Sequence, residues 1–187
     1  MQISENQNQA AGDIVDLIVH ATGRNGGVHP ATAIAGAARL SGSFLLRSFK
    51  FEVGDAKPGT VLLSQEANEE GPLLINVIGA VLSSLGVQID NSQMESAEPQ
   101  TSNLDFLTSM EATQSEAIKI MEKHGLEAKE MSVSCAMATA FIIQQCRQDL
   151  PAEAGFQTAI MGLIEGSKTA PPKMTYTEKK KKRFGLW

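Results

Sequence analysis

The sequence predicts an all-α fold, a compact bundle of about six helices. Only 5% of the 187 residues are aromatic. The core must therefore be built from Ala, Leu, Ile, Val and Met, which suit close helix packing better than a β-sandwich. Apolar residues also recur at three- and four-residue spacings, as on one face of a helix. Proline begins several of these segments and glycine follows them, as expected at helix ends.

The first helix is expected at residues 13–22, after a polar and loosely held leader at 1–11. The glycine-rich turn at 23–27 ends this helix, because glycine tolerates the left-handed conformation found at helix C-termini. Four apolar residues have helical spacing within it: Ile14, Leu17, Ile18 and Ala21.

The second helix is expected at residues 30–49, with Pro30 well placed as its first residue. One face of this helix has almost no side chain, which allows another backbone to approach closely. We therefore expect a helix from this chain, or from a second copy, to cross here. The small residues on this face are Ala31, Ala35, Ala38 and Gly42.

A short extended segment is expected at 60–64, followed by a third helix at 73–85. An isolated strand needs a partner, so the extended segment is either a loop or part of a small ribbon. Pro72 stands just before the helix and Gly86 just after it, the arrangement preferred at helix ends.

Three more helices are expected after the polar stretch 88–103, namely at 104–124, 132–148 and 151–166. The second of these three is apolar nearly all round, which predicts burial on most sides. The helical domain therefore covers 1–172, either as one compact domain or as two three-helix halves. If there is a boundary between halves, it falls in 88–103, because loops this long inside compact domains are uncommon.

Charge is divided unevenly along the chain. The full sequence has 16 Lys and Arg against 21 Asp and Glu, a net charge of −5. Residues 173–187 contain six of these cations and one of these acids, which gives this C-terminal arm +5 and leaves −10 on residues 1–172. An acidic body with a basic, aromatic-tipped arm predicts that the arm docks on a partner. The docking residues are Lys179, Lys180, Lys181, Lys182, Arg183, Phe184, Leu186 and Trp187.

Three partners could receive the arm. The first is the acidic body of a second copy, which would make the protein a homo-oligomer, with a dimer as the simplest form. The second is an anionic membrane surface, although one short cluster of cations attaches only weakly and is sensitive to salt. The third is nucleic acid, which the acidic body argues against by repelling a polyanion. We therefore predict a protein partner and no nucleic acid.

Motifs of the common enzyme classes are missing from the sequence, including the Walker A loop, H-E-x-x-H, C-x-x-C and G-x-S-x-G. Three His and two Cys, far apart in sequence, predict neither a metal nor another cofactor. Cys135 and Cys146 fall in one predicted helix about 16 Å apart, too far for a disulfide between them. Both are expected to be buried thiols.

Five polar residues in or beside the apolar helices could converge on an anionic or polar ligand: His20, Arg24, His29, Arg39 and Asn76. The alternative is structural, since a buried Arg or Asn must be paired or hydrogen-bonded. In that case Arg39 would pair with a carboxylate such as Glu66 or Glu69, and Asn76 would bond a neighbouring backbone group.

The sequence thus favours a non-enzymatic homo-oligomeric scaffold or adaptor that docks through its C-terminal arm. The alternative is a helical enzyme or small-ligand-binding protein with a pocket at the five polar residues. The polar N-terminus lacks Lys and Arg and is not a targeting peptide. The longest apolar stretch, 73–87, is too short to span a bilayer. We therefore predict no transmembrane segment and a cytoplasmic location.

Overall fold

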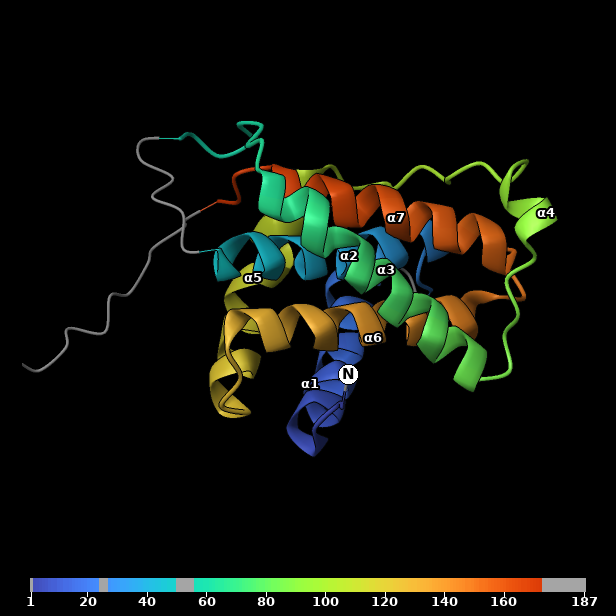
Figure 1. Cartoon of the computed structure of the whole chain (residues 1–187), viewed down its shortest axis with the longest axis horizontal. Helices are drawn as coiled ribbons and strands as arrows, with labels where there is room; N and C mark the ends of the chain where they lie inside the picture. Colours follow the sequence, from blue (N-terminus) through green and yellow to red (C-terminus); the bar gives the residue numbers. More distant parts are fainter. Residues whose placement is uncertain (1, 24–26, 50–55, 173–187) are drawn as a thin grey trace, which may run out of the picture.

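The computed structural model describes residues 2–23, 27–49 and 56–172, and these residues are mainly helical (Figure 1). This confirms the predicted all-α fold. The described ranges contain no strand, and an antiparallel bridge joins Val61 to Thr169. The helices are α1 (Glu5–Thr22), α2 (Pro30–Ser48), α3 (Gln65–Ser84), α4 (Asn91–Met94), α5 (Phe106–Lys123), α6 (Ala128–Cys146) and α7 (Ala152–Lys168).

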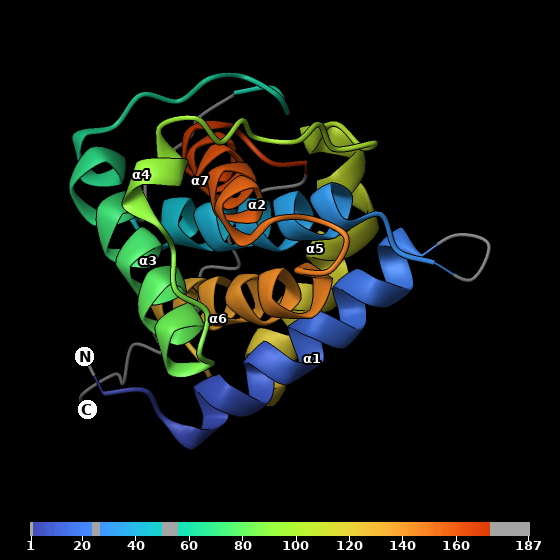
Figure 2. The same ribbon diagram turned by 90° about the vertical axis from the view of Figure 1, so that its right-hand side faces the viewer.

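Helix α2 lies at the centre of the bundle. Every residue from 31 to 46 is buried, and α2 contacts α1, α3, α5, α6 and α7. Figure 2 shows α2 in the middle, with α7 above it, α6 below it, and α3 and α5 to its sides. Since small residues dominate α2, neighbouring helices can approach its axis from all directions. Elements from both sides of the polar stretch 88–103 share the same hydrophobic core.

The N-terminal segment is a helix rather than the loose leader that the sequence suggested. Ser4 and Gln7 form a capping box, in which the Gln7 backbone N–H donates to Ser4 Oγ at 3.2 Å and the Ser4 N–H donates to Gln7 Oε1 at 3.0 Å. Such a box satisfies two backbone donors at a helix start. Ala10 and Ala11 are fully buried, so the first turns of α1 belong to the core.

Helix α3 begins at Gln65, eight residues before the start predicted at Leu73. The Ser64 hydroxyl caps it by accepting a hydrogen bond from the Ala67 backbone N–H at 3.0 Å. Pro72 lies inside the helix and leaves the carbonyl of Asn68 without its usual donor. Both residues are exposed, so water can satisfy that carbonyl and the helix continues past the proline.

The expected extended segment at 60–64 pairs with the chain that follows α7. The backbone N–H of Leu62 donates to the Lys168 carbonyl at 2.7 Å, and that of Ala170 donates to the Thr60 carbonyl at 2.9 Å. The segment before α3 is therefore tied to the end of α7. In the polar stretch 88–103, the structure adds the short helix α4, which the sequence did not predict.

Helix α6 confirms the expectation of a helix buried on most sides, since residues 131–140 are all buried. It begins at Ala128 rather than at 132, with Glu127 and Glu130 forming a capping box. None of the helices in the described parts of the chain combines the length and apolar character needed to cross a membrane.

Candidate functional site

The backbones of α2 and α7 cross in close contact. A Cβ built on Gly42 would lie 2.6 Å from the Ser167 backbone nitrogen, and one on Gly162 would lie 3.0 Å from the Ala35 carbonyl oxygen. Only glycine fits such positions without a shift of the backbone. This confirms the helix crossing expected on the small-residue face of α2, and it shows that the crossing helix is α7 of the same chain.

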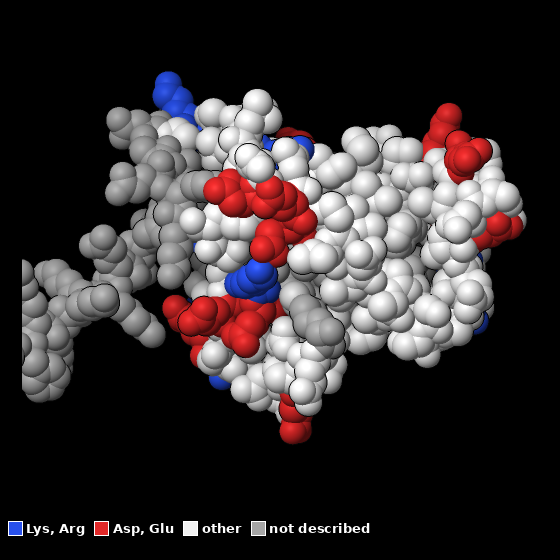
Figure 3. Space-filling model, viewed as in Figure 1, with Lys and Arg blue, Asp and Glu red and all other residues white. Residues whose placement is uncertain are grey.

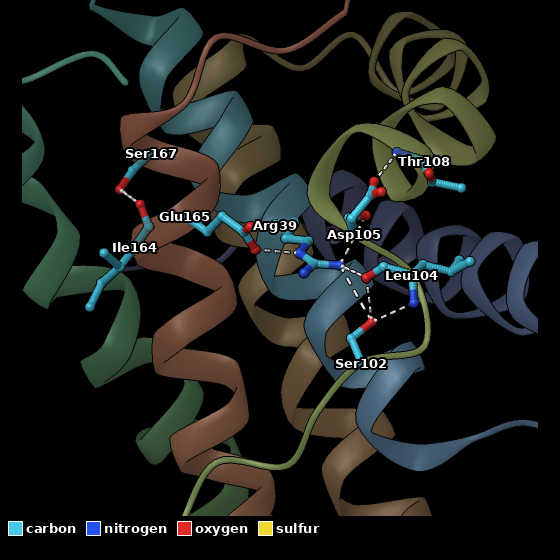
Figure 4. A network of polar contacts seen from close by, with 8 residues as sticks. All are labelled: Arg39, Ser102, Leu104, Asp105, Thr108, Ile164, Glu165 and Ser167. Atoms are coloured by element: carbon cyan, nitrogen blue, oxygen red, sulfur yellow. Dashed lines mark hydrogen bonds and ion pairs between the residues drawn. The ribbon is translucent and has the colours of Figure 1, made fainter. Parts of the chain in front are cut away.

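The close crossing buries Arg39, the only charged residue between 31 and 46. Arg39 is 7% exposed, and its Nε donates to Glu165 Oε2 on α7 at 2.7 Å (Figure 4). The expected pairing of Arg39 with a carboxylate is thus confirmed, but the partner is neither Glu66 nor Glu69. Glu66 and Glu69 lie on the exposed start of α3, whereas Glu165 faces Arg39 directly across the crossing.

The Arg39 guanidinium also holds the end of the polar stretch in place. Its Nη1 donates to the Leu104 carbonyl at 2.7 Å, and lies 3.3 Å from the Asp105 carbonyl and 3.4 Å from Ser102 Oγ (Figure 4). Hydrogen bonds from a charged donor are stronger than those from a neutral donor. The segment that leads into α5 is therefore anchored on the central helix.

We call residues 99–104 the strap, because they run across the junction of α2 and α7. Two threonines hold it in addition to Arg39. The Gln100 backbone N–H donates to Thr158 Oγ1 of α7 at 2.9 Å, and the Asn103 N–H donates to Thr32 Oγ1 of α2 at 2.9 Å. Both threonines are buried. The strap is thus attached to both helices by side chains that are themselves fixed by packing.

A depression opens between α2, α7 and the strap, with a volume of about 400 Å³. We call it the Arg39 depression. Arg39 and Glu165 are its charged lining residues. Its apolar rim includes Met161, which is 56% exposed, and Ile164, which is 42% exposed. Apolar walls with a few placed polar groups are the usual composition of ligand sites.

Two atoms of the Arg39–Glu165 ion pair have no hydrogen-bond partner among the described residues. These atoms are Arg39 Nη2 and Glu165 Oε1, since the hydrogen bonds of the pair within the described chain use Nε, Nη1 and Oε2. Within the described chain, Ser43 Oγ is the one fully buried side-chain polar atom without a partner. Arg39 Nη2 is therefore not sealed in the core, and it remains open to solvent.

The structure does not bring the other predicted ligand residues to Arg39. His20 is exposed on α1 and lines a groove between α1 and α5. His29 precedes α2, lines a separate depression, and its Nδ1 lies 2.8 Å from Thr32 Oγ1. Asn76 is exposed on α3. Arg24 lies outside the described residues. His20, His29 and Arg39 thus line three different depressions.

The groove beside His20 contains a small network of charges. Asp13 Oδ2 on α1 lies 2.8 Å from Lys123 Nζ and 2.8 Å from His124 Nε2 at the end of α5. Hydrogen bonds from Lys123 and then from His124 hold the pKa of Asp13 below its ordinary value of 3.8. The network joins α1 to α5, and the lining of the groove is mostly charged.

The two cysteines are poorly suited to nucleophilic chemistry. Cys135 is fully buried in α6, and burial raises the pKa of its thiol far above the ordinary value of 9.0. Burial, together with nearby Asp149, also raises the pKa of Cys146. Thiolates are the reactive form, so both residues are held in the unreactive thiol state. In the described ranges, no group of three or more His, Cys, Asp or Glu residues could hold a metal ion.

A second feature of the surface is an uncharged face formed by α3 and α7. Residues 71–89 contain no charged residue, and neither do residues 154–164. Figure 3 shows a broad area without charge over α7 and the later part of α3, while acidic side chains gather over the start of α3, which contains Glu66, Glu69 and Glu70. We call it the α3–α7 face. Four exposed apolar side chains define it: Val61, Leu63, Leu73 and Ile164.

These four side chains come from elements that are in contact. Helix α3 packs against α7, and Phe156 of α7 lies against Gly79 of α3. The segment that carries Val61 and Leu63 is hydrogen-bonded to the end of α7. Leu63 is 85% exposed and Val61 is 66% exposed. Large apolar side chains this exposed on neighbouring elements are typical of a contact site for another molecule.

The predicted docking residues from Lys179 to Trp187 lie outside the described residues. The described chain ends at Pro172, whose carbonyl accepts a hydrogen bond from Gln114 Nε2 of α5. Gln114 Oε1 in turn accepts a hydrogen bond from Arg47 Nη2 at 2.7 Å. The point from which the basic segment continues is thus fixed to the body.

Sequence reasoning missed Glu165 and the strap. A usable signal was present, because Glu165 is the only charged residue between 154 and 166, just as Arg39 is the only one between 31 and 46. Opposite charges that stand alone in two apolar, glycine-containing helices indicate a buried pair. In comparisons with known proteins, no protein family, no curated protein and no solved structure matches this chain.

Proposed function

We propose that the protein is a non-enzymatic homo-oligomeric scaffold or adaptor, and that two copies associate through the α3–α7 face. The observation that supports this most directly is the exposure of Leu63, Leu73 and Ile164 in or beside the uncharged stretches 71–89 and 154–164. Large apolar side chains normally leave water when a partner is available, and each contributes roughly 1.5–3 kcal/mol when fully buried.

A second copy suits this face better than an unrelated charged partner does. Residues 1–172 carry a net charge of −10, so two bodies repel each other over most of their surfaces. Repulsion is weakest where the contact carries little charge, and the stretches 71–89 and 154–164 of the α3–α7 face carry none. A two-fold dimer would place the same face on both sides of the contact, as most homodimers do.

The size of the face is adequate for a modest dimer. Two helices of this length, packed side by side, cover an area of about 30 Å by about 20 Å, or on the order of 600 Å² for each copy. Stable interfaces bury about 800 Å² for each partner. The area from the two helices alone is somewhat smaller, so a further contact would strengthen the dimer.

The basic segment 173–187 can supply that contact. It carries +5, opposite in sign to the body. Fifteen residues reach up to about 50 Å when extended, which is enough to cross a dimer interface from Pro172. Attraction between this segment and the acidic body of the second copy weakens as salt increases, because surface charges are screened.

The test is the solution mass of the full chain, measured by light scattering at low and high salt. We expect a dimer that dissociates when Ile164 is replaced by Glu, and also when Leu73 is replaced by Glu. Val19 of α1 provides a matched control, because it is 43% exposed against 42% for Ile164 and also lies near the end of its helix. Val19→Glu should leave the mass unchanged. A monomeric wild type, or equal masses for all variants, would refute the proposal.

The sequence-based alternative was a single ligand pocket shared by five polar residues. The separation of His20, His29 and Arg39 into three depressions does not support it. Arg39 nevertheless lines a depression with ligand-like composition.

A further inference from the structure

We propose that the Arg39 depression is a binding site for a neutral amide group attached to a branched apolar group. The Arg39–Glu165 pair presents one unused donor and one unused acceptor, Arg39 Nη2 and Glu165 Oε1, from the same ion pair. An amide carries both a C=O acceptor and an N–H donor, so it complements both atoms at once.

The burial of Arg39 gives the site its strength. The Arg39 side chain is 9% exposed and that of Glu165 is 40% exposed. The arginine is therefore held rigidly, while the glutamate can still be reached from outside. Hydrogen bonds to charged groups are stronger than those between neutral groups. A ligand amide would replace the water that now solvates the two unused atoms.

Charge argues against an anionic ligand. Glu165 lies 2.7 Å from Arg39 and neutralises it, and the surrounding body has a net charge of −10 over residues 1–172. A carboxylate or phosphate placed on Arg39 Nη2 would stand beside the Glu165 carboxylate, which would repel it. The net neutral pair instead favours a neutral ligand with its own donor and acceptor.

The rim selects the group attached to the amide. Met161 and Ile164 stand at the edge of the depression with 56% and 42% of their surfaces exposed. Pro99 at the start of the strap also lines the depression. A thioether, a branched chain and a proline ring form an apolar clamp that can accept an aliphatic side chain. Methionine adapts well to such contacts.

The wall of the site is preorganised. Thr158 and Thr32 each accept a backbone hydrogen bond from the strap at 2.9 Å. Arg39 itself holds the Leu104 carbonyl. Because these residues are already held in place, the protein loses little conformational entropy when a ligand binds against them.

The test is amide NMR on the full chain, titrated with N-acetyl-L-leucine amide and, separately, with N-acetyl-L-leucinate. We expect saturable shifts of the strap amides and of Gly162, with the amide probe binding roughly tenfold more tightly than the carboxylate probe. Glu165→Gln keeps the shape but removes the repelling charge, and it leaves Arg39 without its counter-ion. The order of affinity should therefore reverse in this variant.

Glu111→Gln on the exposed side of α5 is the matched control and should keep the wild-type order. A third probe, the capped tripeptide N-acetyl-Ala-Leu-Ala-amide, separates the two sources of an amide. Tighter binding of the tripeptide assigns the natural ligand to a polypeptide, and equal binding assigns it to a small molecule. Absence of saturable shifts in the strap, or the same probe preference in Glu165→Gln and wild type, would overturn the inference. Ile164 belongs both to this rim and to the α3–α7 face, so the titration is repeated on Leu73→Glu protein, in which the dimer contact is broken while the rim stays intact.

Discussion

Gly166 of α7 lies against the backbone of Arg39, so that a Cβ on the glycine would lie only 2.9 Å from the Arg39 carbonyl carbon. No flexible side chain is available to move aside there. We therefore expect Gly166→Ala to push α7 away from α2 and lower the free energy of unfolding by about 1–3 kcal/mol or more. Urea unfolding, followed by circular dichroism, measures this change.

Gly12 provides the control for that substitution. It lies within α1, and a Cβ placed on it would meet nothing within 4 Å. Alanine is the better helix former by up to about 1 kcal/mol, so Gly12→Ala should be neutral or stabilising. Equal effects of the two substitutions would show that the close α2–α7 crossing does not contribute to stability as described.

The strap should loosen when Thr158 is replaced by valine. This change keeps the side-chain shape but removes the oxygen that accepts the Gln100 N–H. We expect a loss of about 1 kcal/mol of stability and a marked increase in hydrogen exchange at Gln100. The measurement is amide hydrogen exchange resolved by NMR.

Thr113→Val tests whether that effect is local. Thr113 is also 2% exposed, but its hydroxyl bonds only within α5, to the Ser109 carbonyl at 2.8 Å. This variant should leave exchange at Gln100 unchanged. A strap that exchanges equally fast in both variants would mean that Thr158 does not hold it.

Asp13 should contribute to acid unfolding. Its pKa is below 3.8 in the folded protein because Lys123 and His124 donate hydrogen bonds to it. A carboxyl group with a lowered pKa stabilises the fold above the unfolded-state pKa, and this contribution is lost as pH falls through the folded value. Asp13→Asn should therefore flatten the loss of stability below about pH 4, as measured by urea unfolding at several pH values.

Asp16 is the comparison residue for this experiment. It is exposed on the same helix and makes no ion pair within the described chain. Asp16→Asn should change the pH dependence of the unfolding free energy below about pH 4 less than Asp13→Asn does. If the unfolding free energy of Asp13→Asn fell more steeply with decreasing pH than that of wild type, the lowered pKa of Asp13 would be contradicted.

Cys146 should react slowly with alkylating reagents. It is partly exposed, but burial and then Asp149 raise the pKa of its thiol above 9.0. At pH 8 its thiolate fraction should thus be smaller than that of an ordinary cysteine. Mass spectrometry after timed treatment with iodoacetamide measures the rate, with Cys135→Ala protein used to isolate the Cys146 signal. A rate faster than that of free cysteine would contradict the raised pKa.

The sequence predicted the central elements of the fold because their signals are local. Pro30 and the small residues of α2 predicted both a helix and a close crossing, and the apolar run in α6 predicted its burial. The missed regions depended on context. The start of α1 looked polar, yet its capping box and two buried alanines make it helical.

The start of α3 was missed for a different reason. Proline usually begins a helix, and nothing in the local sequence shows that Pro72 and Asn68 both face water. The candidate site was predictable only in part, since Arg39 stood out but its partner did not. Glu165 lies 126 residues away in sequence, and only the crossing of α2 with α7 brings the two charges together.

The enclosure of α2 has a consequence for how the chain folds. Helix α2 is synthesised second among the described helices. Its buried surroundings are complete only when α7, the last described helix, packs across it. During synthesis the small-residue face of α2 stays uncovered for more than a hundred residues. Because such long-range contacts slow folding, we expect nascent chains that stop before residue 152 to remain non-native and to engage chaperones until the final helix emerges.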